Sequence, residues 1–334
     1  MKNRREFLKG AATGAVLLRT HSKLGLASML ESHDQRAQSA KSKVVVATDA
    51  ALHGRGGQLD EKRVLALLDR AIAAYTGRDN PVEAWKRIVP RDKVIGLKTN
   101  GLGGKGICTH QALVMAVAQR LQQAGIKPGN ILVWDRDARD LEACGLTIST
   151  DPNRIRCYGS DVSGFEDQVE TWGSAHARLS KILTRECAIV IGLPILKDHN
   201  LAGVTFAMKN MYGVLERPQD LHSGGCNPSV ADLNCIPIIR EKVRFTIGDA
   251  MSSVCDGGPG FHPEYLWQPN TLIVGEDRVA IDHTAWQMIE RRRAETGLPT
   301  LEAAGRPPRY IATAADADHK LGTNDPKRIQ LMEI

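Results

Sequence analysis

The sequence predicts an α/β fold, in which a mainly parallel sheet carries helices on both faces and an irregular loop region is inserted. Short continuous apolar runs recur along the chain, and residues 188–193 form the clearest of them. Runs of this length without polar alternation are typical of parallel strands that are buried on both faces. Amphipathic helical patterns lie between several of these runs, as in residues 61–76. The alternation favours a sheet that is built from strand–helix units.

The first half of the chain is assigned from apolar runs, helical spacing and the residues that end each segment. Gly77 follows the helical pattern of residues 61–76 and is expected to cap that helix. Thr109 is expected to cap the next helix at its start. The predicted elements are a strand at 43–48, a helix at 61–76, a strand at 93–97, a helix at 109–124, a strand at 131–134, an irregular region at 138–175 and a helix at 175–186.

The second half alternates in the same way after a long loop. Residues 216–228 are rich in proline and glycine, so we expect a loop that covers the site as a lid. Ser229 is expected to begin a short helix. The remaining predicted elements are a strand at 243–248, a glycine-rich turn at 256–260, a strand at 271–275, a helix at 276–292 and a late strand at 309–313.

The stretch from residue 189 to residue 215 is the centre of the predicted site. A buried strand ends at Pro194, a polar loop is expected at 197–200, and residues 202–215 are expected to form a helix. Lys209 lies among apolar residues of that segment, where an unpaired ammonium is costly. It therefore either pairs with a carboxylate for structural reasons or points into a cavity, and Thr205 would share its helix face.

Polar residues follow several predicted strands, and the carboxyl ends of parallel strands are where ligands bind in open α/β sheets. We therefore expect one pocket that binds a small anionic ligand. Asp249 or Asp282 is expected to offset part of the lysine charge. The candidate catalytic residues are Lys98, Lys197, His199, Lys209 and Asp249, and the candidate substrate-binding residues are Asn100, Thr205, Asn210, Gly257, Gly258 and Asp282.

The start of the chain resembles a twin-arginine export signal. Arg4 and Arg5 precede Phe-Leu-Lys and a short, mildly apolar segment that is too short to span a membrane. Residues 1–42 are therefore expected to be a signal and a flexible link. The protein is expected to be periplasmic or otherwise exported, with the twin-arginine translocation machinery as a partner and no membrane span in the mature chain. Residues 43–334 are expected to form a single α/β domain, or two lobes that meet near residues 138–175.

Charge and composition argue against nucleic acid as a partner. The first 43 residues carry nine Lys and Arg against three Asp and Glu, so the whole net charge of +6 belongs to them. The rest of the chain is neutral, whereas nucleic-acid surfaces are basic. Aromatic residues make up 4% of the chain, which also disfavours a stacking platform for single strands.

Several segments together resemble the domain-of-unknown-function family numbered 362. They are residues 98–100, 193–200, 203–210, 249, 257–260 and 273–282. The Thr205-x-x-x-Lys209-Asn210 pattern is the most specific of them. The chain departs from the family pattern at Thr99, where proline is expected, and at the step from Cys255 to Asp256. The resemblance supports the predicted fold and pocket, and it implies no settled reaction.

The seven cysteines have no Cys-x-x-Cys spacing, which leaves zinc ribbons and iron–sulfur motifs without support. Cys226, Cys235 and Cys255 lie in the predicted lid and turn region with His222 and His262. These residues could ligate a soft metal, but in an oxidising compartment a disulfide is the stronger expectation. The spacing of these residues therefore assigns no metal ligands, and the sequence does not tell which cofactor, if any, the protein binds.

Three function classes remain open from the sequence. The first is an enzyme that converts a small anionic substrate, with Lys98, Lys197 and Lys209 as clamp, base or nucleophile. The second is a metal- or redox-linked accessory protein of the periplasm. The third is a non-catalytic binding protein that uses the same pocket. The sequence does not name the substrate, the cleavage site of the signal or the oligomeric state.

Overall fold

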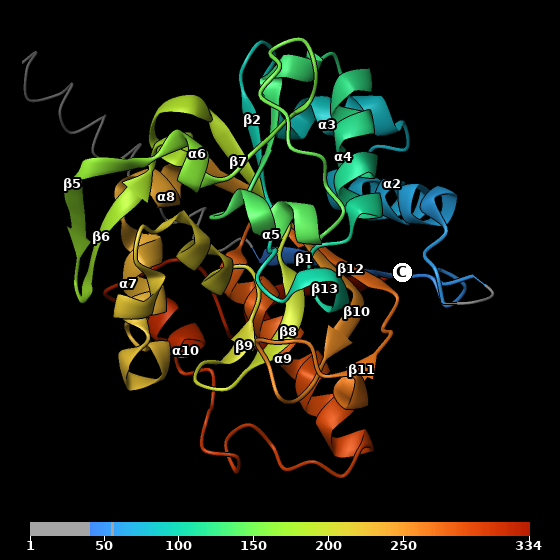
Figure 1. Ribbon diagram of the computed structural model, residues 1–334. Helices are drawn as coiled ribbons and strands as arrows, with labels where there is room; N and C mark the ends of the chain where they lie inside the picture. The colour runs from blue at the N-terminus through green and yellow to red at the C-terminus, as the bar shows by residue number, and fades with distance from the viewer. Residues whose placement is uncertain (1–40, 55–56) are drawn as a thin grey trace, which may run out of the picture. The chain divides into compact units, whose positions relative to one another are not determined.

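The computed structural model describes residues 41–54 and 57–334, and a mixed sheet of eleven strands runs through this part (Figure 1). The main path of the sheet follows the order β13 (Ile329–Glu333), β1 (Ser42–Thr48), β12 (Thr271–Gly275), β10 (Val243–Val254), β7 (Ile189–Gly192), β2 (Ile95–Lys98), β3 (Ile131–Trp134) and β4 (Arg156–Cys157). Along this described path, β12 pairs antiparallel with β1 and β10, while the other neighbours are parallel. The predicted α/β fold with a mainly parallel sheet is confirmed.

Helices cover both faces of the sheet, as the sequence predicts. The alternation of side chains along a strand separates two apolar cores. Ile131 and Val133 of β3 belong to one core, and Leu132 and Trp134 belong to the other. The first face packs against α2 (Glu61–Thr76), α3 (Pro81–Ile88) and α4 (Gln111–Gln123), and the other face packs against α7 (Ser229–Cys235), α8 (Pro237–Lys242), α9 (Arg278–Glu295) and α10 (Tyr310–Ala314).

Local sequence signals explain where α2 begins and where it ends. The Asp60 side chain accepts hydrogen bonds from the backbone N–H groups of Lys62 and Arg63, which have no partner inside the helix. Gly77 ends the helix in the left-handed conformation, with φ of 67°, and its N–H donates to the Ala73 carbonyl. The strands at 131–134 and 271–275 also begin and end where they are predicted.

The central stretch differs from its prediction, because it forms a β-hairpin instead of a loop and a helix. Residues 197–199 belong to β8 (Ile195–His199), which turns into β9 (Gly203–Thr205), and a 3-10 helix, η4 (Lys209–Val214), follows. Gly203 has φ of 75°, a left-handed conformation that suits glycine at the turn of the hairpin. A fully buried apolar segment has the same composition in a strand and in a helix, so periodicity does not distinguish the two.

Two further predictions of secondary structure are wrong, because tertiary packing overrides the local pattern there. Residues 175–186 form β6 (Ala175–Ser180) and a π-helical turn, and β6 pairs with β5 (Phe165–Trp172) in a separate two-stranded sheet. Residues 310–313 fall in α10, with residue 309 directly before it, instead of in a late strand. The side chains of Tyr310 and Ile311 are buried in the second core, so tertiary packing sets the conformation of this short segment.

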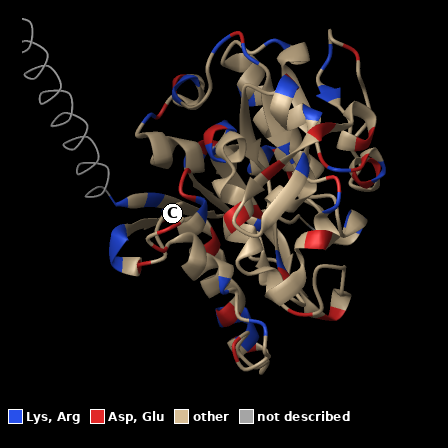
Figure 2. Cartoon of the chain, turned by 90° about the vertical axis from the view of Figure 1, so that its left-hand side faces the viewer, with Lys and Arg blue, Asp and Glu red and all other residues tan. Residues whose placement is uncertain are grey.

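Residues 138–175, predicted to be irregular, hold short elements that border the site. They include α5 (Ala138–Ala143), β4 and α6 (Ser160–Ser163). Residues 42–334 form one compact unit, while the predicted export signal lies outside the described residues. Within the described part, no helix has the length and apolarity needed to cross a membrane. Positions of Lys and Arg are interspersed with those of Asp and Glu over its elements (Figure 2).

Candidate functional site

A cavity of about 160 Å³ lies at the carboxyl ends of β2 and β3, where open α/β sheets bind ligands. Six segments line it: the end of β2 with the residues after it, the residues after β3 with α5, the hairpin of β8 and β9, η4, the loop that follows η4, and the turn at Pro259. The sequence-predicted site residues that line this cavity are Lys98, Asn100, Lys197, His199, Thr205, Lys209 and Asn210.

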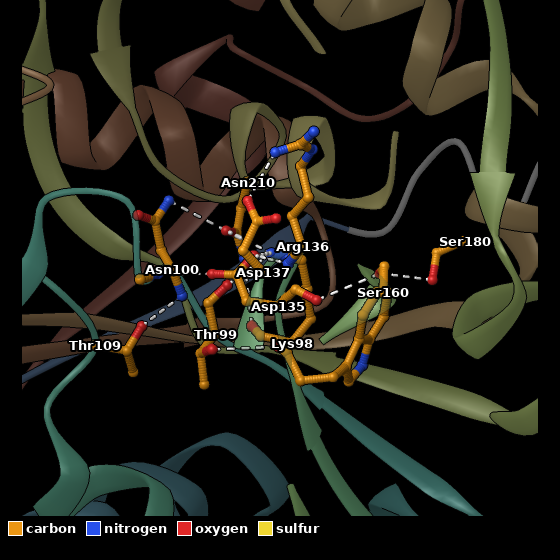
Figure 3. A network of polar contacts seen from close by, with 12 residues as sticks. Lys98, Thr99, Asn100, Thr109, Asp135, Arg136, Asp137, Ser160, Ser180 and Asn210 are labelled. Atoms are coloured by element: carbon orange, nitrogen blue, oxygen red, sulfur yellow. Dashed lines mark hydrogen bonds and ion pairs between the residues drawn. The ribbon is translucent and has the colours of Figure 1, made fainter. Parts of the chain in front are cut away.

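A buried ion pair joins Lys98 at the end of β2 to Asp135 at the end of β3 (Figure 3). The Lys98 Nζ lies 2.6 Å from the Asp135 Oδ1 and also donates to the Thr99 carbonyl at 2.7 Å. Asp135 accepts two backbone N–H groups, from Gly101 at 2.6 Å and from Arg136 at 2.8 Å. Each charge is therefore both paired and hydrogen-bonded, which is what makes burial of an ion pair tolerable.

The backbone of η4 lies directly on this ion pair. A Cβ atom on Gly213 would come within 2.5 Å of the Lys98 Nζ and 2.7 Å of the Asp135 Oδ1. Asn210 of the same helix accepts a hydrogen bond from the Asn100 Nδ2 at 3.2 Å and donates to the Lys98 carbonyl at 3.3 Å. The pair thus holds two strand ends and η4 together around the cavity.

Lys197 and His199 point to the same side because they are two residues apart on β8. Asp198, between them, faces the other side, where Arg306 Nη1 donates to both its carboxylate oxygens at 2.9 Å. The Lys197 side chain is fully buried, and its Nζ makes one long hydrogen bond, 3.4 Å, to the Ile107 carbonyl. No carboxylate of the described chain bonds to it, and burial lowers the pKa of Lys197 to about 8.

His199 is held neutral, and its backbone neighbours fix which nitrogen carries the proton. The Nδ1 atom accepts hydrogen bonds from the N–H groups of Leu201 at 3.1 Å and Ala202 at 3.2 Å. The proton of the neutral ring must therefore be on Nε2, which is left as a donor. Burial is the main reason that the pKa of His199 is lowered to about 2, and the charge of Lys209 adds to it.

Lys209 differs from Lys197 in having closer neighbours around its nitrogen. Its Nζ lies 3.5 Å from the centroid of the Tyr212 ring and 3.3 Å from the His222 Nε2. His222 must donate from Nδ1 to the Pro218 carbonyl at 2.9 Å, which leaves Nε2 as an acceptor for Lys209. Burial lowers the pKa of Lys209 to about 8, whereas the aromatic face favours the charged form.

Three polar atoms that belong to cavity-lining residues are buried without a hydrogen-bond partner in the structure. They are the Thr205 Oγ1, the Asn100 Oδ1 and the Arg136 Nε. Buried polar groups are nearly always satisfied, so each such atom calls for an explanation. A bound molecule with acceptor and donor groups is one source of the missing partners.

Asp140 on α5 is a candidate site residue that the sequence analysis missed. It lines the cavity, and its carboxylate makes no hydrogen bond within the described residues. Burial, together with the neighbouring charges of Asp135 and Asp137, raises the pKa of Asp140 above its usual value. A raised carboxyl pKa in a cavity is typical of a proton donor or acceptor. Its position two residues into a predicted irregular region gave no sequence signal.

Two carboxylates that were expected to offset the lysine charge have other partners outside the cavity lining. Asp249 accepts from the backbone N–H of His110 at 2.9 Å and bonds to the ring Nδ1 at 2.8 Å, so it braces the start of α4. Thr109, the expected cap, instead donates to the Leu193 carbonyl at 2.6 Å. The fully buried Asp282 accepts from the N–H groups of Ala207 at 2.6 Å and Met208 at 3.1 Å.

The glycine-rich turn contributes to the site indirectly. The N–H of Gly258 donates to the Asp198 Oδ2 at 3.0 Å, on the side of β8 away from Lys197. A Cβ on Gly257 would lie 2.7 Å from the ring of His262, so this residue serves close packing. Pro259, which follows them, lines the cavity. The two glycines therefore position the turn, while the cavity wall comes from the next residue.

All seven cysteines are free thiols in the structure, which does not contain the expected disulfide among Cys226, Cys235 and Cys255. The Cys235 thiol donates to the His319 carbonyl, and the Cys255 thiol donates to the Tyr265 carbonyl. Among the described residues, no group of three or more His, Cys, Asp or Glu side chains could hold a metal ion.

The chain matches the model of a known protein family. The model for the family described as Domain of unknown function (DUF362) matches residues 95–287, which include β2, β3, the hairpin of β8 and β9, and η4. The chain belongs to this family, as its sequence motifs indicate. Among curated proteins, none matches the chain.

Two solved structures show distant likeness in fold. A protein from Thermotoga maritima has a TM-score of 0.45 at 10% identity, with 72% of this chain and 60% of that chain covered. The lactate racemase apoprotein from Thermoanaerobacterium thermosaccharolyticum has a TM-score of 0.39 at 9% identity, with 72% of this chain and 55% of that chain covered. This chain thus spans less than two thirds of either structure.

The ion pair leads to a prediction on stability. Replacing Lys98 with methionine leaves the Asp135 carboxylate buried and uncompensated, so we expect the free energy of unfolding to fall by about 3–5 kcal/mol. Lys105 is exposed near the same loop, and Lys105→Met is the matched control, with an expected change within about 0.5 kcal/mol. Urea unfolding of both variants measures the difference. Equal stability of the two variants would show that the pair does not hold the site together.

Proposed function

We propose that this protein binds a small organic anion in the cavity and converts it with the amine of Lys197. The proposal rests on which of the cationic side chains that line the cavity have a carboxylate partner. Lys98 and Arg136 have carboxylate partners, at 2.6 Å and 2.7 Å, whereas Lys197 and Lys209 have none within the described chain. Two cationic groups are thus left to face whatever occupies the cavity.

The hydrogen-bonding groups around the cavity also favour an anion. Lys197, Lys209, the His199 Nε2–H and the Thr205 hydroxyl can all donate, and Asp140 is the carboxylate there without a hydrogen-bonded partner. Ammonium groups removed from water are unfavourable unless a counter-charge lies beside them. A ligand carboxylate or similar anion supplies that charge, and attraction is strong where water is excluded.

The proposal assigns conversion to Lys197 because its nitrogen is free to react. An amine with a pKa of about 8 is partly neutral near physiological pH, and a neutral amine can act as base or nucleophile. A non-catalytic binding protein would use the same cavity and differ only in the absence of turnover. The metal-linked alternative finds no group of three or more His, Cys, Asp or Glu side chains among the described residues that could hold an ion.

The first prediction of this proposal concerns Lys209. Lys209→Met keeps the apolar stem and removes a buried charge, so we expect the variant to be at least as stable as the parent protein. Loss of the ammonium should weaken binding of small carboxylates by about tenfold or more. Thermal melts with and without a panel of small carboxylates measure both effects. A large fall in stability without ligand would make Lys209 a structural group instead.

The second prediction concerns pH. An anion beside Lys197 and Lys209 raises the pKa of both amines from about 8, so binding at about pH 8.5 should take up protons. Near pH 6 both amines are already charged, and uptake should fall toward zero. Asp135, Asp140, Cys108 and Cys144 also act on Lys197, and Cys226 and His222 lie beside Lys209.

Calorimetry of carboxylate binding in two buffers with different ionisation enthalpies measures this proton uptake. Lys209→Met should reduce it, because one of the two titrating amines is removed. Proton release at about pH 8.5, or no exchange at all, would contradict the charge assignment.

We also propose export by the twin-arginine route, which rests on the sequence of the first nine residues. Replacing Arg4 and Arg5 with lysine keeps the charge but removes the paired arginines that the translocation machinery recognises. We expect full-length precursor to accumulate in the cytoplasm, as seen by fractionation and immunoblotting. Export of the double variant at the level of the parent protein would contradict this route.

A further inference from the structure

We propose that Lys197 forms an imine with the carbonyl carbon of a small 2-oxo acid, whose carboxylate lies against Lys209. This inference rests on the proposed function and narrows it to one substrate class and one nucleophile. It requires a free amine, donors for a carboxylate, a proton source and a cavity of matching size. The described residues supply each of these.

Of the three lysines that line the cavity, Lys197 is the one with a free nitrogen. Lys98 is held by Asp135, by the Thr99 carbonyl and by the Asn210 Oδ1 at 3.4 Å. Lys209 lies over the Tyr212 ring and within 3.3 Å of the His222 Nε2, so two close neighbours engage its nitrogen. Lys197 has a single weak contact at 3.4 Å. Desolvation without a strong partner is what makes a lysine nucleophilic.

The side chains around Lys197 can donate hydrogen bonds to the carboxylate oxygens or to the carbonyl oxygen of the 2-oxo acid. Thr205 is the direct partner of Lys197 across the hairpin of β8 and β9, and its hydroxyl has no hydrogen-bond partner. His199, two residues along β8, presents the Nε2–H. These groups are fixed on strands, so they are already oriented when the substrate arrives.

The size of the cavity limits the substrate. Its volume of about 160 Å³ is close to that of an engineered cavity of roughly 150 Å³ that holds benzene, which has six non-hydrogen atoms. Glyoxylate and pyruvate are of this size. Each carries a carboxylate next to a carbonyl, which matches a charged clamp and a nucleophile in the same small space.

The reaction balances with Asp140 as the proton source. The neutral Lys197 amine attacks the carbonyl carbon, the new C–N bond forms, and one amine proton passes to the carbonyl oxygen. The resulting hydroxyl leaves as water with a proton from the Asp140 carboxyl. The products are a protonated imine on Lys197, one water and the Asp140 carboxylate. Asp140 is suited to this step because burial, and then the charges of Asp135 and Asp137, raise its pKa and favour its protonated form.

The substrate itself stabilises the charge that develops. The imine nitrogen becomes cationic in a site where the structure provides no hydrogen-bonded carboxylate for it. A carboxylate on the adjacent carbon lies beside that new charge, and the ionised Asp140 lines the same cavity. An oxo acid is therefore favoured over a simple aldehyde or ketone of equal size.

Borohydride trapping tests the inference on the purified protein. Pyruvate and glyoxylate are each added with sodium cyanoborohydride, and intact mass is measured. We expect one adduct per chain, with a mass gain of the acid less one oxygen atom, and peptide mapping should place it on Lys197. Propionate has the carboxylate but no carbonyl, so it should compete with trapping and give no adduct.

Variants separate the roles of the residues, and the mapping on the parent protein stands even if a variant fails to fold. Lys197→Met should abolish the specific adduct, while Lys105→Met, an exposed lysine outside the cavity lining, should not change it. Asp140→Asn should slow trapping by about 100-fold and change its pH profile, because general acid catalysis is lost. Unchanged trapping in Asp140→Asn would remove Asp140 from the reaction.

The outcomes distinguish this inference from the proposed function. Carboxylates that stabilise the protein, with no adduct from pyruvate or glyoxylate, would overturn the imine and leave anion binding intact. An adduct mapped to Lys209 or to exposed lysines would overturn the assignment of Lys197. No stabilisation by any small carboxylate, together with no adduct, would overturn both.

Discussion

The buried pair of Lys98 and Asp135 is the contact on which the rest of the site depends. It joins the ends of two neighbouring parallel strands, and the backbone at Gly213 closes over it. Charges buried in this way are unfavourable unless every one is compensated, so the pair fixes the positions of its neighbours closely. Thr99 lies beside this pair (Figure 3), and Thr99, Gly101 and η4 are all placed by hydrogen bonds or packing to it.

Around this pair, the fold gives three lysines of similar sequence context three different electrostatic environments. Lys98 has a carboxylate, Lys209 has an aromatic face and a histidine acceptor, and Lys197 has neither. The difference arises from secondary structure, because a strand pair and a tight 3-10 helix present side chains in different directions. Identical side chains in different environments can take different roles, so one site can combine binding and reaction.

The same hairpin also explains how opposite charges are kept apart. Alternation along β8 sends Lys197 and His199 to the cavity and Asp198 to the other side, where Arg306 and the N–H of Gly258 satisfy it. A helix would place Asp198 within about 100° of both neighbours and bring its carboxylate toward the lysine. The strand therefore protects the free amine from an internal counter-ion.

Sequence alone determined the features that depend on local periodicity and end groups. The helix between Asp60 and Gly77, several buried strands, the α/β class and the family followed from such signals, and so did seven of the residues that line the cavity. Those signals are local because capping and side-chain spacing involve residues a few positions apart.

Only the tertiary structure decided which groups meet. The partner of Lys98 is 37 residues away in Asp135, the partner of Asp249 is 139 residues away in His110, and Asp140 faces the cavity from an element that periodicity did not reveal. The conformation of residues 197–215 was likewise settled by burial, since an apolar segment surrounded by protein can satisfy its backbone as strand or helix. Packing across the sheet, which no local pattern records, therefore selected both the hairpin and the roles of its lysines.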